Sequence, residues 1–296
     1  MIHYKECPIC REQALQPFLE AKDYTVSQQQ FSLVSCGNCR LVLTQDVPAQ
    51  EEIGPYYQSQ QYISHSDTRK GFINQLYHGV RKITLASKRK LVVRHTGMLN
   101  GNLLDIGCGT GAFLHQMKTA GWNITGLEPD DTARANALSL YGITALPSHE
   151  LYQLPQASFD AITLWHVLEH VHELTAYIKT IQQLLKPGGT LFIAVPNYTS
   201  ADAAHYGKYW AAYDVPRHLY HFSPQSMKTL LRIYGLHVKA VKPMWFDSVY
   251  VSMLSEQYKN GKSNLWSALW QGFYSNIKTL FNHEKCSSLI YIVKKG

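Results

Sequence analysis

The sequence predicts an α/β protein with a doubly wound, Rossmann-like sheet of seven strands, a small four-cysteine module before it and a helical insertion before the last strand. Three observations predict this fold. Short apolar runs alternate with helical segments after residue 101, as in parallel strands joined by crossover helices. A glycine-rich turn directly follows the first run, and two CxxC pairs occur within the first 40 residues.

The expected elements follow from apolar periodicity and from glycine and proline breaks. A helix at 68–95 shows apolar residues at three- and four-residue steps. The strands are expected at 102–106, 123–127, 143–146, 159–164, 190–195, 236–241 and 288–293. The helices between them are expected at 112–120, 131–141, 173–185 and 223–234. We therefore divide the chain into a zinc-ribbon module (1–45), a connector with a basic helix (46–100) and a main domain (101–296) with acceptor-side insertions at 197–222 and 244–286.

The composition is that of an ordinary globular protein, with 45% hydrophobic residues among 296. No apolar run of about 18 residues occurs, so no transmembrane segment is expected. The N-terminus does not combine a basic stretch with an apolar one, so we expect a cytoplasmic protein. The net charge is +7, and eight basic residues but no acidic one lie between Arg69 and Arg94. This stretch is either a solvated helix face or a surface for an anionic partner, such as RNA or a peripheral membrane contact.

The first 40 residues hold four of the six cysteines, Cys7, Cys10, Cys36 and Cys39. In a cytoplasmic chain this spacing indicates a metal site before a disulfide, because such thiols stay reduced. Two CxxC turns can direct four thiolates at one Zn²⁺ ion. A four-thiolate site leaves no open position for water, so we expect structural zinc. The alternative is a set of reduced thiols without a metal.

The glycine-rich turn comprises Gly107, Gly109 and Gly111, directly after the strand at 102–106. Glycines let the backbone approach a ligand closely, and the helix that follows offers free N–H groups. The spacing is GxGxG and differs from the GxGxxG of dinucleotide-binding folds. Glu128 ends the next strand, 23 residues after Asp105, where a carboxylate can accept both hydroxyls of a ribose.

Three segments resemble class I S-adenosylmethionine-dependent methyltransferases of types 11 and 23. They are LDIGCGTGAF at 104–113, FDAITLWHVLEH at 159–170 and LKPGGTL at 185–191. The resemblance covers about residues 85–243 and implies an enzyme that binds S-adenosyl-L-methionine. It implies that the methionine part is held by Asp105, Gly107, Cys108, Gly109 and Gly111. It also implies that Glu128 binds the ribose and that the adenine lies between two sets of residues, His149, Glu150 and Leu151 on one side and Trp165 and His166 on the other.

A rival motif overlaps the second segment. His166, Glu169 and His170 fit the HxxEH pattern of zinc peptidases. On one helix, the two histidines would share a face. The preceding strand instead places His166 at a strand end, so we favour the methyltransferase. Zinc stoichiometry separates the two hypotheses, because the methyltransferase needs one ion and the peptidase needs two.

The acceptor is expected to bind the insertion at 197–222. Four polar residues, Asp214, Arg217, His218 and His221, fall within eight positions. Histidine is a natural base near neutral pH, and Arg217 could clamp a carboxylate or phosphate. The alternative is a structural network that holds this loop.

Three functions remain open: two kinds of methyltransferase that differ in their acceptor, and a non-catalytic module. We favour a small-molecule, glycan or lipid-linked acceptor methylated on oxygen or carbon. The segment at 210–223 resembles a bacterial group that is often encoded with cell-envelope glycan or lipid genes. Some ribosomal RNA methyltransferases also begin with a cysteine ribbon, as do some sugar C-methyltransferases, so an RNA methyltransferase is the first alternative. A non-catalytic module that binds S-adenosylmethionine is the second.

Overall fold

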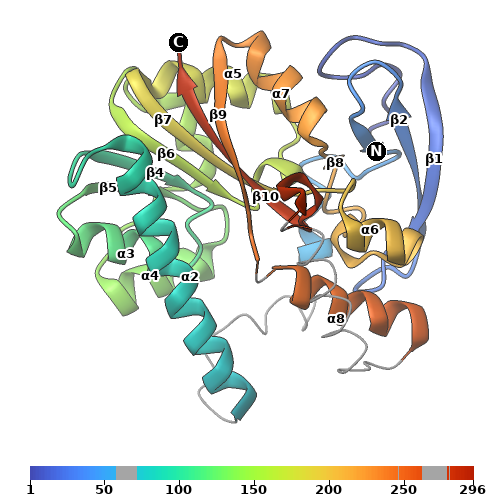
Figure 1. The fold of residues 1–296 in the computed structure, drawn as a ribbon, viewed down its shortest axis with the longest axis horizontal. Coiled ribbons are helices and arrows are strands. Elements are labelled where there is room, and N and C mark those ends of the chain that lie inside the picture. The colour runs from blue at the N-terminus through green and yellow to red at the C-terminus, as the bar shows by residue number, and fades with distance from the viewer. Residues whose placement is uncertain (58–71, 246, 262–278, 280) are drawn as a thin grey trace.

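The computed structural model describes residues 1–57, 72–245, 247–261, 279 and 281–296. Two sheets organise this part of the chain (Figure 1). The larger has six strands in the order β5-β4-β6-β7-β10-β9, and the smaller has four in the order β1-β2-β3-β8. The expectation of an α/β protein with a Rossmann-like sheet is confirmed.

The central sheet is parallel except around its last strand. Its strands are β4 (Asn102–Ile106), β5 (Asn123–Leu127), β6 (Phe159–Trp165), β7 (Leu185–Pro196), β9 (Leu236–Pro243) and β10 (Ser288–Lys295). β10 runs antiparallel to β7 and to β9. The seventh strand, expected at 143–146, is reduced to one bridge between Leu146 and Leu127. Pro147 follows at once and has no N–H to extend a ladder.

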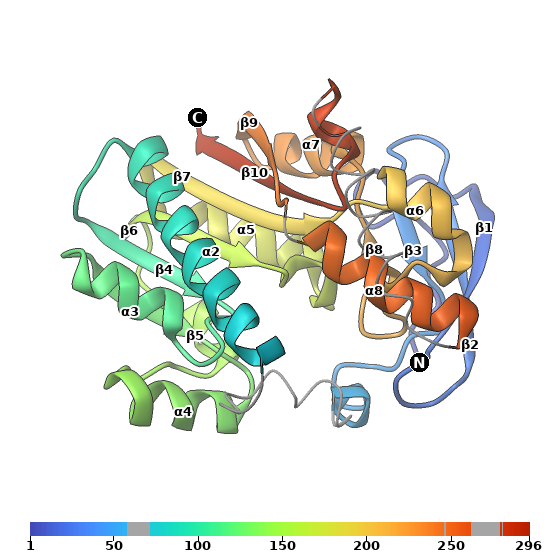
Figure 2. The same cartoon turned by 60° about the horizontal axis from the view of Figure 1, so that its bottom comes forward.

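Helices cover both faces of this sheet (Figure 2). One face carries α2 (Phe72–Thr96), α3 (Ala112–Thr119) and α4 (Asp131–Tyr141), and the other carries α5 (Leu174–Leu184) and α7 (Pro224–Ile233). The strands supply both apolar layers by alternation: Leu103 and Phe192 pack with α2 and α3, whereas Leu104 and Ile193 pack with α5 and α7. The basic helix expected at 68–95 therefore packs on the sheet, with Val92 fully buried.

The smaller sheet joins the cysteine module to the main domain. Its strands are β1 (Leu15–Lys22), β2 (Gln30–Cys36), β3 (Val42–Thr44) and β8 (Tyr220–His221). β8 comes from the insertion at 197–222 and pairs with β3 through Val42 opposite His221 and Leu43 opposite Tyr220. The module thus shares its sheet with the expected acceptor side, since β8 covers an edge that β3 would otherwise expose.

The two insertions pack against each other. They contain α6 (Ala201–Tyr206) and α8 (Asp247–Asn260). Helix α8 buries a row of small side chains, Ser248, Ser252 and Ser255, and Ser255 Oγ accepts a hydrogen bond from the N–H of Ala211 (2.9 Å). The second insertion also holds Trp245, which is described, and Trp266 and Trp270, which lie outside the described residues.

Short 3-10 helices connect the larger elements. They are η1 (Gly54–Tyr57), η2 (Ser148–Gln153), η3 (Leu168–His170), η4 (Gly207–Tyr209), η5 (Ala211–Tyr213) and η6 (His283–Lys285). Among the helices of the described ranges, none is both long and apolar enough to cross a membrane.

Candidate active site

The glycine turn lies between two strand ends. The N–H groups of Gly107 and Cys108 both donate to the carbonyl of Leu127, at 2.7 and 3.0 Å. Gly107 has a φ of 71°, and a Cβ there would lie 2.4 Å from Val167 Cγ2. Only glycine fits this close approach. The turn is therefore held against the end of β5 and against the segment that follows β6.

Glu128 bonds directly to this turn. Its two carboxylate oxygens accept hydrogen bonds from the N–H of Gly109 (2.8 Å) and from the N–H of Asp130 (3.0 Å). Burial raises its pKa, although these two amides act in the opposite direction. Its carboxylate thus sits at the rim of the turn, where a ligand lying on the glycines would meet it.

Asp105 lies beneath the turn and is fully buried. Thr163 Oγ1 donates to its carboxylate at 2.6 Å. Burial raises the pKa of Asp105 to about 7, against the opposing effects of Thr163 and of the Lys88 ammonium. Lys88 in turn lies 4.4 Å from the ring centroid of Trp165, a cation–π contact. The carboxyl group of Asp105 is therefore expected to titrate near neutral pH.

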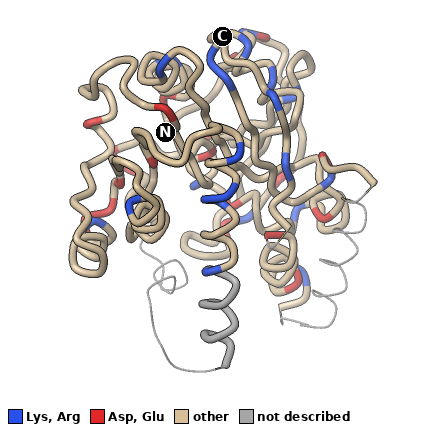
Figure 3. Tube along the Cα trace, turned by 60° about the vertical axis from the view of Figure 1, so that its left-hand side comes forward, with Lys and Arg blue, Asp and Glu red and all other residues tan. Residues whose placement is uncertain are grey.

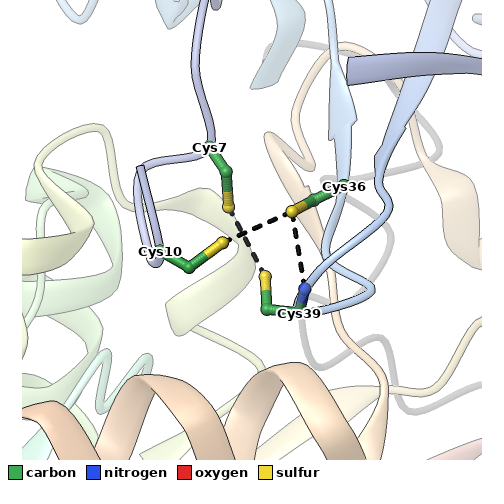
Figure 4. Close-up of side chains that lie close together, drawn as sticks. All are labelled: Cys7, Cys10, Cys36 and Cys39. Atoms are coloured by element: carbon green, nitrogen blue, oxygen red, sulfur yellow. Dashed lines mark hydrogen bonds between the residues drawn. The ribbon is translucent and has the colours of Figure 1, made fainter. Parts of the chain in front are cut away.

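The four N-terminal cysteines form one cluster, with donor atoms within 4.8 Å of one another. Cys7 Sγ lies 3.5 Å from Cys39 Sγ, and Cys10 Sγ lies 3.4 Å from Cys36 Sγ (Figure 4). All four are free thiols. The hydrogen bond with Cys39 lowers the pKa of Cys7 to about 5 despite burial, whereas burial raises the pKa of Cys36.

The two CxxC pairs share one backbone geometry. The N–H of Arg11 donates to the carbonyl of Cys7 (2.9 Å), and the N–H of Arg40 donates to the carbonyl of Cys36 (3.0 Å). Arg11 and Arg40 have left-handed φ values of 61° and 60°. Each turn therefore directs its two thiols into the same space.

The loop after α6 holds a buried ion pair. Arg217 is 2% exposed, donates through Nε to Asp214 at 2.9 Å and makes a second bond from Nη2 to the same carboxylate. Its Nη1 donates to the carbonyl of Tyr56 (2.9 Å). Burial opposes the charge of Arg217, but Asp214 outweighs it and raises the pKa above its usual value. Arg217 and Asp214 therefore hold the loop, and little of the guanidinium is left for a ligand.

The two histidines of this loop have different surroundings. His221 Nε2 lies 2.9 Å from Thr44 Oγ1, and burial lowers its pKa well below the ordinary value. His218 Nδ1 lies 2.9 Å from the carbonyl of Ala212, and its ring meets the ring of His170 edge-on with centroids 4.6 Å apart. His221 thus faces the cysteine module, whereas His218 faces the segment that follows β6.

The comparisons with known proteins decide the family. The family described as "Methyltransferase domain" matches residues 81–241, which is more than half of the chain. The chain belongs to the class I S-adenosylmethionine-dependent methyltransferases. A ubiquinone biosynthesis O-methyltransferase of Xanthomonas axonopodis pv. citri is 31% identical over 160 residues, which are 49% of this chain and 66% of that protein. The protein of the same name from Xanthomonas euvesicatoria pv. vesicatoria is 30% identical over 165 residues, which are 51% of this chain and 68% of that protein.

Solved structures support the same fold for this methyltransferase. A putative sarcosine dimethylglycine methyltransferase from Galdieria sulphuraria superposes with a TM-score of 0.51 at 14% identity, covering 82% of this chain and 91% of that one. A 1,6-didemethyltoxoflavin-N1-methyltransferase from Burkholderia thailandensis, bound to 1,6-didemethyltoxoflavin and S-adenosylhomocysteine, gives 0.50 at 15% identity, covering 95% and 99%. At these identities, the likeness shows the fold alone.

The other residues of the methyltransferase that are predicted to bind the cofactor differ in exposure and in contacts. Leu151 is fully buried in η2. His149 is exposed and Glu150 is partly exposed, with side-chain atoms 3.6 Å apart. Trp165 packs edge-on against Phe113, and its Nε1 has no hydrogen-bond partner among the described residues. The glycine turn, Glu128 and the start of η2 are therefore contiguous, because Glu128 N–H donates to the carbonyl of Leu146 just before η2.

His166 directly follows β6 and has a φ of 59°. Its ring lies between Glu169 Oε1 (3.3 Å) and Asp247 Oδ2 of α8 (2.9 Å). Burial opposes its charge, but these two carboxylates raise the pKa of His166 to about 10. The imidazolium joins α8 to the main domain. The helical arrangement required by the peptidase motif is also absent, since His166 belongs to a strand end.

Sequence reasoning missed a second cluster in the methyltransferase. Glu169 and His170 in η3 meet His218, and one potential ligand atom from each lies within 4.8 Å of the others. The HxxEH motif drew attention to the first two residues but paired His170 with the wrong histidine. His218 lies 48 positions further along the chain, so no local spacing could have revealed it.

Lys and Arg positions occur along α2 and on strands beside it (Figure 3). The charges of Arg94, Lys242 and Lys294 act together with burial to lower the pKa of His95. We call these three residues the basic surface. Arg94 lies at the C-terminal end of α2, and the two lysines lie on β9 and β10.

Proposed function

We propose that this methyltransferase transfers the methyl group of S-adenosylmethionine to a hydroxyl oxygen of a small-molecule, glycan or lipid-linked acceptor. The observation that carries this proposal is the buried cluster of Glu169, His170 and His218 beside the glycine turn. It begins two residues after Val167, which packs on Gly107. A hydroxyl acceptor must lose its proton near neutral pH, and such a cluster supplies that chemistry.

The cofactor occupies the glycine turn in this proposal. Asp105 and the backbone of 107–111 hold the methionine part, Glu128 accepts the ribose hydroxyls, and Leu151 and Trp165 border the adenine. The acceptor oxygen attacks the methyl carbon while the carbon–sulfur bond breaks and its electron pair stays on sulfur. The Glu169–His170–His218 cluster promotes loss of the hydroxyl proton to solvent water. In-line placement of the two reactants lowers the barrier most.

The four-cysteine cluster binds one structural Zn²⁺ ion. Sulfur atoms around tetrahedral zinc, with Zn–S bonds of about 2.3 Å, are ~3.8 Å apart, and the two close pairs here lie at 3.5 and 3.4 Å. The matching turns at Cys7 and Cys36 support the same assignment. The zinc-ribbon module at 1–45 then holds β8 and the loop before it in place.

O-methylation is supported further by the names of the curated relatives, which are O-methyltransferases of ubiquinone biosynthesis. These relatives are matched over about two thirds of their length. The family match at 81–241 does not include the cysteine module. The acceptor class is therefore proposed from the shared region, and the module is treated as a separate addition to it.

A panel of acceptors tests the proposal. Purified protein is incubated with S-adenosylmethionine and, in parallel, with catechols, simple phenols, sugars and matched amines, and products are identified by mass spectrometry. We expect a mass gain of one methylene on a hydroxyl compound, with S-adenosylhomocysteine formed in equal amount. Methylation confined to the amines would overturn the proposal. A separate calorimetric titration with S-adenosylmethionine alone shows whether the cofactor site is intact.

A further inference from the structure

The Glu169–His170–His218 cluster has the features of a metal site that differs in kind from the cysteine cluster. It offers two imidazoles and one carboxylate, and one potential ligand atom from each residue lies within 4.8 Å of the others. Two histidines and one carboxylate are a common ligand set for divalent transition metals, and they leave coordination positions open.

Both imidazoles are oriented by backbone carbonyls. His170 Nδ1 lies 3.0 Å from the carbonyl oxygen of Arg217, and His218 Nδ1 lies 2.9 Å from that of Ala212. A carbonyl can only accept, so each Nδ1 carries the proton and each Nε2 keeps its lone pair. Ligating histidines are typically fixed in this way, with the second ring nitrogen donating to a carbonyl or carboxylate.

The carboxylate has one oxygen in use and one without a partner. Glu169 is 1% exposed. Its Oε1 contacts His166 Nδ1 at 3.3 Å, while its Oε2 is buried and forms no hydrogen bond with any described residue. A buried carboxylate oxygen without a partner is costly, and a bound cation beside the two imidazoles would satisfy it.

The neighbouring charged groups do not fill this position. Asp214 Oδ2 lies 3.8 Å from His218 Nε2, but that carboxylate is already paired with Arg217. His166 is turned to Asp247 on its far side. Within the described part of the chain, the cluster therefore keeps two nitrogen lone pairs and one carboxylate oxygen without a hydrogen-bond partner.

We propose that Glu169, His170 and His218 bind a divalent first-row transition-metal ion, distinct from the zinc of the four cysteines. Its further role rests on the proposed function. An open coordination position would bind the acceptor hydroxyl and lower the pKa of that hydroxyl, so that its proton passes to solvent water before methyl transfer. The chain would then hold two metal ions, with different ligand chemistry and different tasks.

Mn²⁺ distinguishes the two sites, because it prefers oxygen and nitrogen ligands whereas the four thiolates select Zn²⁺. Zinc-loaded protein is titrated with Mn²⁺, and free Mn²⁺ is followed by electron paramagnetic resonance. We expect one Mn²⁺ bound per chain. Glu169→Gln and His218→Ala should each weaken this binding by about 100-fold or more, and Tyr57→Phe, which removes the hydroxyl 3.0 Å from His170 Nδ1, by about tenfold.

His172→Gln is the matched control, because it replaces a histidine two residues from His170 whose Nε2 contacts the carbonyl of Pro48. It should leave Mn²⁺ binding unchanged. Thermal unfolding and calorimetry with S-adenosylmethionine establish that each variant is folded. If the folded wild type binds neither Mn²⁺ nor Co²⁺, the proposed site is wrong. It is also wrong if Glu169→Gln and His218→Ala bind Mn²⁺ as tightly as the wild type does. Metal binding without methyl transfer to any hydroxyl would retain the site and refute the proposed function.

Discussion

The proposed cofactor side and the proposed acceptor side of this methyltransferase are built in opposite ways. The proposed cofactor side is mostly continuous in the chain: Asp105, the glycine turn and Glu128 lie between β4 and the residue that follows β5, and Glu128 bonds directly to the turn, although Thr163 of β6 also bonds to Asp105. The acceptor side brings together Thr44, η1, η3, the loop before β8 and α8. A local motif can specify the first, whereas the second exists only when distant segments fold together.

The largest expected effect comes from removing the metal of the cysteine module. Cys36→Ser together with Cys39→Ser should abolish zinc binding and lower methyl transfer by at least about 100-fold, since structural zinc supplies folding free energy of several kcal/mol. Thr44 on β3 holds the loop through a 2.7 Å bond to the carbonyl of His218, so the loop loses its support. Affinity for S-adenosylmethionine should change by less than about threefold, as measured by calorimetry.

Cys286→Ser is the control for this prediction. Cys286 is equally buried but lies outside the cysteine cluster, so its substitution should leave zinc content and transfer close to wild type. Full transfer by zinc-free protein would show that the acceptor side does not depend on the module. The contrast between the two sides would then fail.

A change on the cofactor side should have the reverse pattern. Glu128→Ala removes a carboxylate that accepts two backbone hydrogen bonds and, in our proposal, both ribose hydroxyls. We expect affinity for S-adenosylmethionine to fall by about 100-fold, because hydrogen bonds to charged groups contribute about 1.5–3 kcal/mol each. Asp131→Asn, at an exposed acid on α4, is the control. Mn²⁺ binding should stay unchanged in both variants, and its loss in Glu128→Ala would link the two sides.

The fold was largely predictable because its signals are local. The alternation of apolar runs and helices located the six strands of the central sheet, and glycines at positive φ marked the turn. The strand at 143–146 was overpredicted, because periodicity does not reveal that Pro147 ends the pairing. The pairing of β8 with β3 and the meeting of His170 with His218 depend on tertiary contacts across large sequence separations, which spacing cannot encode. For the same reason, His221 and Arg217 looked like catalytic candidates, although their contacts with Thr44 and Asp214 favour structural roles.

A smaller effect is expected from pH on the cofactor side. Burial raises the pKa of Asp105 to about 7 in the folded protein, from 3.8. An ionised Asp105 attracts the positively charged cofactor, so affinity should rise roughly tenfold between about pH 6 and about pH 8 and then level off. Stability of the free protein has the opposite sign: the ionised buried carboxyl costs stability as pH rises from 3.8, and the cost is complete above about 7. Calorimetry on Asp105→Asn should give weaker binding without this rise, and an unchanged pH profile would exclude Asp105 as its source.

The smallest effect is expected at the basic surface. The charges of Lys242 on β9, Lys294 on β10 and Arg94 all act on His95, and these residues belong to neither side of the proposed site. The double substitution Lys242→Glu and Lys294→Glu should therefore leave cofactor affinity, Mn²⁺ binding and transfer to a small acceptor unchanged. The RNA alternative predicts otherwise: RNA affinity in the wild type would fall steeply with salt, and the two charge reversals would weaken it further and flatten that dependence. Filter binding of a structured RNA at low and high salt measures this directly. A steep, substitution-sensitive salt dependence would make this surface part of acceptor recognition and extend the acceptor side across the sheet edge.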